Sequence, residues 1–459
     1  MKRDIAVIGS GYVGTVVAAC LGTLGHHVTG VEIDPSKLES LKESRAPFHE
    51  AGLDDLLQIA SAQGNLSFTD DLASAVSESQ VIFLCVGTPP GSHGEPDMSA
   101  VAAAARSIAG ALRSRHILIN KSTVPIGTGQ WLASIIEEAL PDPSRGKELF
   151  TVVSNPEFLR EGTAVQDFLH PDRVVLGSSD DDALAVVEDI YRPILDQSIP
   201  GGDLAARPPL IRTSVETAEM IKYASNAFLA TKISFINEMA NICELVGADV
   251  TEVAGAMGID RRIGPQFLEA GVGWGGSCFG KDLDALISIA LESGYEPRLL
   301  EATHAVNLHQ RDAVCDKLRR TLRGLRGRRI GILGLAFKPG TDGLRDAPAL
   351  DITRHLIGAG ALVSAFDPVV DETPIPELKI VSQAYDVAYR ADAVVLTTEW
   401  PEFLGLDFVK IKSHMRGNVF IDGRNLFDPA TIKAAGLRYE SMGRTHTTSR
   451  ASSEDEFRR

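Results

Sequence analysis

The chain has 459 residues and a formal net charge of −16, with 44% hydrophobic and 23% charged residues. At roughly 150 residues per domain, this length predicts about three domains, and the composition is ordinary for a globular protein with a substantial core. The acidic balance argues against a nucleic-acid-binding protein, which usually carries a basic face. It does not exclude an anionic ligand, because a few cations in one cleft can still bind one.

The cysteines and the N-terminus bear on the compartment. The cysteines are Cys20, Cys85, Cys243, Cys278 and Cys315. Their odd number, wide spacing and lack of a C-x-x-C pair disfavour a disulfide framework and a zinc site. Residues 1–3 and the apolar stretch after them are similar to a signal peptide, but glycines interrupt the stretch, and no apolar run reaches the roughly 18 residues of a membrane span. We therefore expect a cytoplasmic protein that binds no metal, nucleic acid or membrane.

The first part of the chain alternates between strand and helix patterns. Residues 4–8 predict a buried strand, an apolar helix runs to about Leu24, and residues 27–31 predict a second strand. Further strands are expected at residues 80–86, 116–120 and 149–153. Alternation of this kind predicts a parallel, doubly wound sheet.

The second part of the chain begins with a long helical pattern. Residues 214–246 carry apolar residues at helical spacing and contain no Gly or Pro, which predicts a buried helix that joins two domains, and helical segments continue to about Arg320. A second α/β unit follows, with expected strands at residues 329–333, 361–366, 393–397 and 418–421 and a helix at 349–356. The expected fold class is α/β, with two Rossmann-like doubly wound domains joined by a long central helix and a helical region. The predicted boundaries are residues 1–212, 213–315 and 316–442, followed by a disordered tail at 443–459.

A glycine-rich turn follows the first expected strand. Gly9, Gly11 and Gly14 form the pattern G-x-G-x-x-G between that strand and an apolar helix. Such glycines let backbone amides approach a pyrophosphate, and the helix N-terminus attracts the anion. Glu32, at the end of the second strand, can accept hydrogen bonds from a ribose diol and would repel a 2′-phosphate. We therefore predict a site for NAD rather than NADP, with Asp34 as the alternative to Glu32.

Polar turn residues follow three expected strands, at residues 87–90, 121–125 and 154–162. Because ligands bind beyond the carboxyl ends of parallel strands, we expect these segments to form one site, although each alone could be an ordinary loop. Glu157 and Glu161 are four residues apart, so they share a face if the third segment forms a helical turn. A carboxylate held there could act as a base or bind a sugar hydroxyl, and the alternative is a solvated surface pair.

Lys222 and Asn226 are also four residues apart, among apolar residues of the predicted long helix. A buried ammonium there would be unfavourable without a partner, and the alternative is a side chain that extends to water. The functional interpretation is a lysine directed at the reacting oxygen beside a nicotinamide.

Residues 271–282 contain glycine at five of twelve positions and a single cysteine, Cys278. Such a loop lets backbone amides point at a ligand. A lone cysteine is usually a small core residue, but this one follows two nearby glycines and precedes Lys281, whose charge would favour the thiolate. Cys278 is therefore either a nucleophile or part of the core.

As a set, these motifs resemble the UDP-glucose/GDP-mannose dehydrogenase family, from the Gly9 turn to about Phe427. The motifs are Gly-Ser-Gly-Tyr-Val-Gly, Ser-Thr-Val-Pro, Asn-Pro-Glu-Phe-Leu-Arg-Glu-Gly, Lys-x-x-x-Asn, Gly-Gly-Ser-Cys-Phe-x-Lys-Asp, and Phe337-Lys338-Pro339 with Arg345-Asp346 after it. The resemblance implies an NAD-binding domain at 1–212, a helical linker and dimerisation domain at 213–315, and a nucleotide-sugar-binding domain at 316–442.

The resemblance also implies an activity. It is the NAD-dependent oxidation of the C6 alcohol of UDP-glucose to UDP-glucuronate, through an aldehyde, a thiohemiacetal on Cys278 and a thioester that water hydrolyses, with two NAD per sugar. The alternatives are a related dehydrogenase for TDP-glucose or GDP-mannose, a single-step hydroxyacid dehydrogenase, and a non-catalytic NAD-binding sensor.

Residue roles are implied in the same way. Cys278 is the expected nucleophile, Lys222 and Asn226 stabilise the oxyanion, and Asp282 lies near the catalytic water. Thr123, Glu157 and Glu161 are expected to assist proton transfer and positioning. The cofactor contacts are Gly9, Gly11, Tyr12, Val13, Gly14, Glu32, Lys37, Thr88, Thr123, Glu161 and Arg345. The substrate contacts are Glu157, Phe158, Leu159, Arg160, Lys222, Asn226, Phe267, Gly273 and Lys338. Arg262 matches an arginine that reaches into the neighbouring subunit's site, which implies a homodimer.

Overall fold

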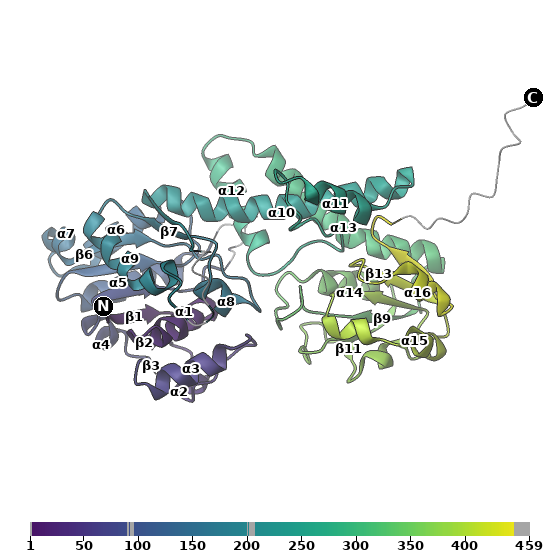
Figure 1. Ribbon diagram of the computed structural model, residues 1–459, viewed down its shortest axis with the longest axis horizontal. Helices are drawn as coiled ribbons and strands as arrows, with labels where there is room; N and C mark the ends of the chain where they lie inside the picture. Colours follow the sequence, from purple (N-terminus) through teal and green to yellow (C-terminus); the bar gives the residue numbers. More distant parts are fainter. Residues whose placement is uncertain (1, 90, 92–95, 200, 202–206, 445–459) are drawn as a thin grey trace, which may run out of the picture. The chain divides into compact units, whose positions relative to one another are not determined.

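The computed structural model describes residues 2–89, 91, 96–199, 201 and 207–444 (Figure 1). It divides into two compact units, one with residues Met1–Asn226 and Lys281–Glu296, the other with Ala227–Gly280 and Pro297–Arg459. Each unit contains a largely parallel sheet and its own helices, which confirms the predicted α/β class.

The sheet of the first unit has eight strands in the order β3-β2-β1-β4-β5-β6-β7-β8. The strands are β1 Asp4–Ile8, β2 His27–Val31, β3 Leu66–Thr69, β4 Val81–Leu84, β5 His116–Asn120, β6 Phe150–Ser154, β7 Val174–Gly177 and β8 Leu210–Thr213. Neighbouring strands pair in parallel except β6 and β7, which meet antiparallel at Ser154 and Gly177. The order of the first six strands is that of a Rossmann fold, whose ligand crevice lies beyond the carboxyl ends of β1 and β4.

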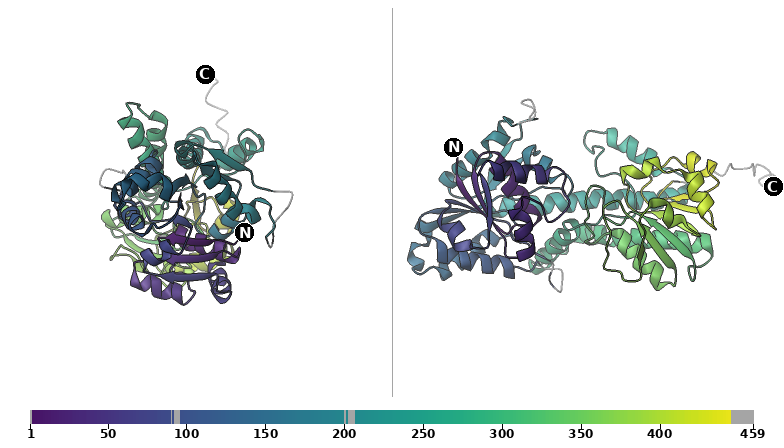
Figure 2. Two further views of the ribbon diagram at one scale, coloured as in Figure 1. Left: turned by 90° about the vertical axis from the view of Figure 1, so that its left-hand side faces the viewer. Right: turned by 90° about the horizontal axis from the view of Figure 1, so that it is seen from below.

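Helices cover both faces of this sheet (Figure 2). They are α1 Tyr12–Thr23, α2 Pro35–Lys42, α3 Leu53–Ala62, α4 Leu72–Ser77, α5 Ser99–Ala111, α6 Thr128–Ala139, α7 Gly146–Leu149, α8 Ala164–Leu169 and α9 Asp181–Leu195. Ile5 and Val7 of β1 pack with α1, α3, α8 and α9, whereas Ala6 and Ile8 pack with α4, α5 and α6. Successive strand residues point to opposite faces, so a strand covered on both sides is apolar at every position.

The predicted long helix is confirmed as α10, Val215–Val246, with 32 residues. The boundary between the two units falls inside it, after Asn226, and falls again inside α12, after Gly280. The other helices of this region are α11 Val250–Ile259, α12 Phe279–Glu292 and α13 Arg298–Leu322. Within the described ranges, none of the helices is both long and apolar enough to cross a membrane.

The sheet of the second unit has six parallel strands in the order β11-β10-β9-β12-β13-β14. They are β9 Arg329–Leu333, β10 Leu362–Phe366, β11 Lys379–Ile380, β12 Ala393–Leu396, β13 Val419–Asp422 and β14 Arg438–Ser441, accompanied by helices α14 Pro348–Gly358, α15 Phe408–His414 and α16 Pro429–Ala434. This order repeats that of the first six strands of the other sheet, so the second Rossmann-like domain is confirmed.

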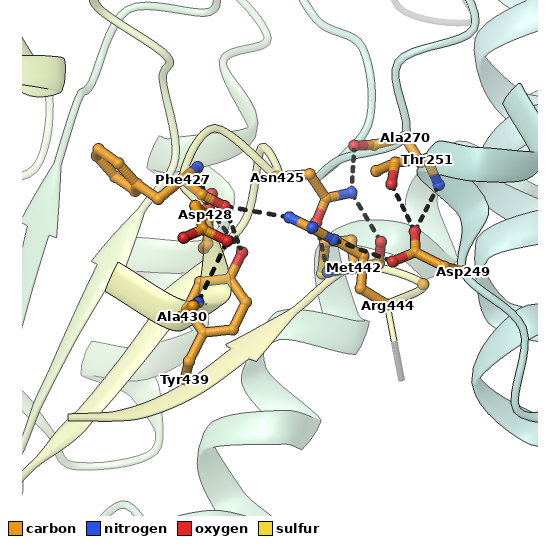
Figure 3. A network of polar contacts seen from close by, with 12 residues as sticks. Asp249, Thr251, Ala270, Asn425, Phe427, Asp428, Ala430, Tyr439, Met442 and Arg444 are labelled. Carbon is orange, nitrogen blue, oxygen red and sulfur yellow. Dashed lines mark hydrogen bonds and ion pairs between the residues drawn. The ribbon is translucent and has the colours of Figure 1, made fainter. Parts of the chain in front are cut away.

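The last described residues are held within the second unit by polar contacts (Figure 3). Asn425 Nδ2 donates to the carbonyls of Ala270, at 3.2 Å, and Met442, at 2.8 Å. Arg444 Nε lies 3.4 Å from Asp249, the residue that caps α11, and its Nη1 donates to the carbonyl of Phe427 at 3.1 Å. Of the predicted disordered tail, Gly443 and Arg444 therefore have fixed partners, and residues 445–459 lie outside the described residues.

Candidate active site

The glycine turn between β1 and α1 is shaped by close backbone packing. Gly9 has φ +91°, and a Cβ on Gly14 would lie 1.9 Å from the carbonyl oxygen of Gly9. A Cβ on Gly11, by contrast, would meet no atom within 4 Å, so the space above the first turn of α1 is open. This turn lets a pyrophosphate approach the amides at the start of α1, and it fits a dinucleotide.

Two carboxylates follow β2, and they have different surroundings. Asp34 caps α2, since its Oδ1 accepts from Ser36 N at 2.9 Å and from Lys37 N at 3.3 Å. Glu32 is buried, and its Oε1 accepts from the amides of Ile33 and Asp34, each at 2.9 Å. In the described part of the chain, Oε2 of Glu32 has no hydrogen bond, so it can accept from a ribose diol, whereas Asp34 already has a structural role. Lys37 is exposed in the first turn of α2.

Tyr12, inside the glycine turn, is bound by a residue that the sequence did not indicate. Its hydroxyl donates to Glu50, which also accepts from Gly162 N at 2.6 Å and from Ala164 N at 2.8 Å. Burial, together with this carboxylate, raises the pKa of Tyr12 far above its usual range. Glu50 thus ties the turn to the segment that contains Glu161. No pattern could have identified it, because residues 43–52 have neither strand nor helix periodicity.

The segments after β4 and β5 contact each other at the carboxyl ends of these strands, as parallel strands require. Thr88 Oγ1 donates to the carbonyl of Thr123 at 2.7 Å, and Ser122 Oγ donates to the carbonyl of Val86 at 2.7 Å. Thr123 itself is half-buried.

Glu157 and Lys222 form a buried ion pair. Lys222 Nζ lies 2.8 Å from Glu157 Oε1, and Leu159 N donates to Oε2 of the same carboxylate at 2.7 Å. The two residues are 5% and 3% exposed, so the alternative in which the Lys222 ammonium extends to water is wrong. Burial by itself would raise the pKa of Glu157, but the charge and hydrogen bond of Lys222 outweigh it and the pKa lies below its usual value.

The expected helical turn from Glu157 to Glu161 is wrong. Residues 155–160 are irregular and a turn follows at 161–162, so the two carboxylates do not share a helix face. The reason is local, because Glu157 binds the amide of Leu159 two residues later, which competes with a helical hydrogen bond. Glu161 is half-buried, and Arg160 is exposed and pairs with Asp167. The Arg173 guanidinium stacks on the ring of Phe158, with its Cζ 3.9 Å from the centre of that ring.

Asn226, one turn after Lys222, is bound to a second buried carboxylate. Its Nδ2 donates to Asp282 Oδ2 at 2.6 Å, and Lys281 Nζ lies 2.7 Å from Oδ1. The Lys281 ammonium, which the sequence suggested as a partner for the thiolate, therefore contacts Asp282. The four-residue spacing on α10 presents an ammonium and an amide on one face, and each is held by a carboxylate from elsewhere in the first unit.

In the second unit, the glycine loop is rigidly bound. Trp274 N donates to Asn307 Oδ1 at 2.8 Å, and the Trp274 carbonyl accepts from Asn307 Nδ2 at 3.0 Å and from Arg311 Nη2 at 2.9 Å. Gly273 has φ +99°, and Gly276 N donates to the carbonyl of Arg345 at 3.1 Å. Most of the loop is therefore fixed before Cys278 is reached.

Of the five cysteines, all of which the structure describes, Cys278 alone is partly exposed. Its Sγ lies 3.5 Å from Ser277 Oγ, and it directly precedes α12, where the helix N-terminus favours negative charge. Burial raises the pKa of the Cys20, Cys85 and Cys315 thiols, which makes them poor nucleophiles. Cys278 is thus the reactive candidate, and it is not a core residue.

The second unit also contains Phe267, Lys338 and Arg262, which were expected to contact the substrate, and Arg345, which was expected to contact the cofactor. Phe267 has φ +63°, and its ring is 6.3 Å from that of Phe279. Lys338 is half-buried beside Phe337, and Arg345 is exposed. Arg262 pairs with Asp260 at 2.6 Å and leaves 89% of its side chain exposed.

Comparison with known proteins assigns these features to a family. The chain matches three domains of the UDP-glucose/GDP-mannose dehydrogenase family, namely the NAD binding domain over residues 3–195, the central domain over 216–309 and the UDP binding domain over 331–429. It is 45% identical over 450 residues to UDP-glucose 6-dehydrogenase TuaD of Bacillus subtilis (strain 168), which covers 96% of this chain and 93% of that protein. It is also 45% identical over 448 residues to UDP-glucose 6-dehydrogenase of Rhizobium meliloti (strain 1021), covering 96% and 99%. Among solved structures, a UDP-glucose dehydrogenase from Pyrobaculum islandicum superimposes with a TM-score of 0.88 at 36% identity, covering 97% of this chain and 98% of that one.

Proposed function

Since the chain belongs to the UDP-glucose/GDP-mannose dehydrogenase family and includes its NAD-binding domain, we propose that it oxidises the C6 alcohol of UDP-glucose to UDP-glucuronate. The near full-length identity of 45% to proteins named UDP-glucose 6-dehydrogenase supports this substrate. The observation that carries the chemistry is the face of α10, where Lys222 and Asn226 are each held by a buried carboxylate. Such preorganised donors stabilise an oxygen that gains negative charge.

The oxidation from alcohol to carboxylate removes four electrons, so each sugar requires two NAD⁺. Bound NAD⁺ accepts two electrons in each oxidation. In the first, Lys222 and Asn226 stabilise the alkoxide that becomes the aldehyde oxygen. The Cys278 thiolate then adds to the aldehyde carbon, and the thiohemiacetal is oxidised to a thioester. Water, activated by one of the nearby carboxylates, releases the acid and returns the thiol.

The alternative substrates differ from UDP-glucose in different parts, since TDP-glucose has another nucleoside with the same sugar, whereas GDP-mannose has both another base and another sugar. We propose that the domain over residues 331–429 holds the diphosphate and base, with contacts from Phe267, Gly273, Lys338 and Arg345. A panel of nucleotide sugars, assayed by NADH release, tests this. Two NADH per UDP-glucose are expected. One NADH would indicate a simple alcohol dehydrogenase, and none with any sugar would indicate a non-catalytic NAD-binding protein.

We further propose a cytoplasmic homodimer. The second unit exposes large apolar side chains on α10 and α11, with Leu245 at 86% and Ile259 at 83% exposed, and such surfaces usually mark an interface. Arg262 pairs with Asp260, but 89% of its side chain is exposed, so a neighbouring subunit can approach it. Sedimentation analysis is expected to show a dimer that Leu245→Glu weakens, and Arg262→Ala is expected to lower activity while the dimer remains.

A further inference from the structure

A second buried lysine lies near the Lys222–Glu157 pair, and the chemistry above does not use it. Lys121 directly follows β5 and is 5% exposed. Its Nζ donates to Asn155 Oδ1 at 3.0 Å and to the hydroxyl of Tyr191 at 3.2 Å, and that hydroxyl donates to the same Asn155 oxygen at 2.7 Å. Lys121 is therefore a buried cation whose hydrogen-bond partners are both neutral.

A buried charge normally requires a counterion close by. Within the described residues, no carboxylate lies within 4.0 Å of the Lys121 ammonium. The titratable groups that face it are Glu157 beyond β6, Lys222 on α10, Cys85 after β4 and Tyr191 on α9. Burial lowers the pKa of Lys121 to about 8, and the negative charge of Glu157 acts in the opposite direction.

Lys121 acts on Glu157 in two ways, through a hydrogen bond to the neighbouring residue Asn155 and through its charge. Asn155, which accepts from Lys121, also donates from Nδ2 to the carbonyl of Val175 at 2.9 Å, so its side chain is fixed from two sides. Glu157 follows Asn155 by two residues. The charge of Lys121 is among the causes that keep the pKa of Glu157 low. Loss of the Lys121 ammonium would therefore affect both the position and the ionisation of Glu157.

We propose that Lys121 is a positioning residue that gives this part of the active site a net positive charge. The Lys222–Glu157 pair alone is neutral, but with Lys121 the three buried groups carry one net positive charge. That charge keeps Glu157 ionised while the Lys222 ammonium stabilises the substrate oxygen. It also favours the negative oxygen that forms in both oxidations. This inference rests on the proposed oxidation of UDP-glucose.

The test compares Lys121→Met with Lys121→Arg in the full-length enzyme, by kcat and kcat/KM for UDP-glucose from about pH 6 to pH 10. A methionine is of similar size and has no charge, and because the hydrogen-bond partners of Lys121 are neutral, its removal leaves no buried ion without a counterion. We expect wild-type activity to decline above about pH 8, as Lys121 loses its proton. In Lys121→Met, we expect this decline to disappear. The acid limb of the pH profile, where activity falls as Glu157 is protonated, should move to higher pH. We also expect kcat to fall about tenfold with little change in KM. Lys121→Arg should restore the acid limb.

Tyr191→Phe provides a second variant that retains the lysine. It removes one acceptor of the ammonium, so the alkaline limb should move to lower pH while the acid limb stays in place. The proposal is overturned if Lys121→Met lowers kcat uniformly with the wild-type pH profile, or if Tyr191→Phe leaves the alkaline limb unchanged. Failure of the proposed function is a different result, in which the wild-type enzyme releases no NADH with UDP-glucose at any pH.

Discussion

Asn226 Nδ2 donates to Asp282 Oδ2 at 2.6 Å, and Asp282 is completely buried. The carboxylate orients the amide, which retains its second N–H for another acceptor. Lys281 Nζ is 2.7 Å from the other carboxylate oxygen, so Asp282 organises two donors at once.

Replacement of Asp282 by asparagine should slow turnover and trap a covalent species. Asparagine keeps one of the two acceptor oxygens that bind Asn226 and Lys281 but loses the negative charge, and water loses one candidate base, so we expect kcat to fall by about 10²–10³. Hydrolysis should become slow enough for a thioester on Cys278 to accumulate. Mass spectrometry of the intact enzyme quenched during turnover measures this adduct. Glu292→Gln, an exposed change on the same helix α12, is the matched control, and unchanged kcat in Asp282→Asn would contradict the assignment.

Cys278→Ser should stop the reaction before the acid. A hydroxyl at this position is a far weaker nucleophile than a thiolate at neutral pH, so the aldehyde stage should not proceed to free UDP-glucuronate. A slow ester linked to residue 278 is expected and can be detected by mass. Cys243→Ala changes a buried cysteine on α10 and should retain two NADH per sugar. Full acid production by Cys278→Ser would remove the thioester mechanism.

Disruption of the Lys222–Glu157 pair should affect stability as well as activity. Lys222→Ala leaves a buried carboxylate without its partner, which typically lowers the free energy of unfolding by about 3–5 kcal/mol. Lys222→Met combined with Glu157→Leu removes both charges and should recover most of that stability, although activity remains lost. Urea denaturation of both variants measures the difference. Equal destabilisation in the single and double variants would show that the ion pair is not the cause.

Glu219 should make stability depend on pH. It lies on α10, and its carboxylate accepts from Gly127 N at 2.7 Å and Gly129 N at 3.0 Å at the start of α6. Burial raises its pKa to about 7, and the two amides only partly offset this. The folded protein therefore keeps the Glu219 proton up to about pH 7, whereas the unfolded chain releases it near 4.5. The favourable contribution is complete below about pH 4.5 and is lost as pH rises to 7.

Thermal unfolding of wild type and Glu219→Gln between about pH 5 and pH 8 isolates this effect. The free energy of unfolding of wild type minus that of Glu219→Gln should be larger at pH 5 than at pH 8. The expected change is about 2 kcal/mol, after allowance for solvent screening. Glu238→Gln, an exposed glutamate on the same helix, is the control. A stability difference that does not change with pH would exclude the titration of Glu219 as its source.

Continuous apolar runs between turn residues made several elements predictable. β1, β2, β5 and β9 lie at the expected residues, and α10 begins one residue later than expected. The strands β3, β7, β8, β11 and β14 were not predicted. β11 has two residues and the others have four, and β8 is no more than half-buried, so neither length nor alternation distinguishes β8 from a loop.

Local pattern also located the glycine turn, the Lys222–Asn226 face and Cys278, because each depends on residues within a few positions of one another. The local pattern could not identify the distant carboxylates that bind these groups. Glu157 lies 65 positions from Lys222, Asp282 lies 56 from Asn226, and Glu50 lies 112 from Gly162. Such pairs form only when the sheet and α10 bring distant segments together, and burial then decides which of them remain charged. The spacing along the chain was thus sufficient to predict the donors Lys222 and Asn226, whereas the carboxylates that orient them are determined by packing in three dimensions.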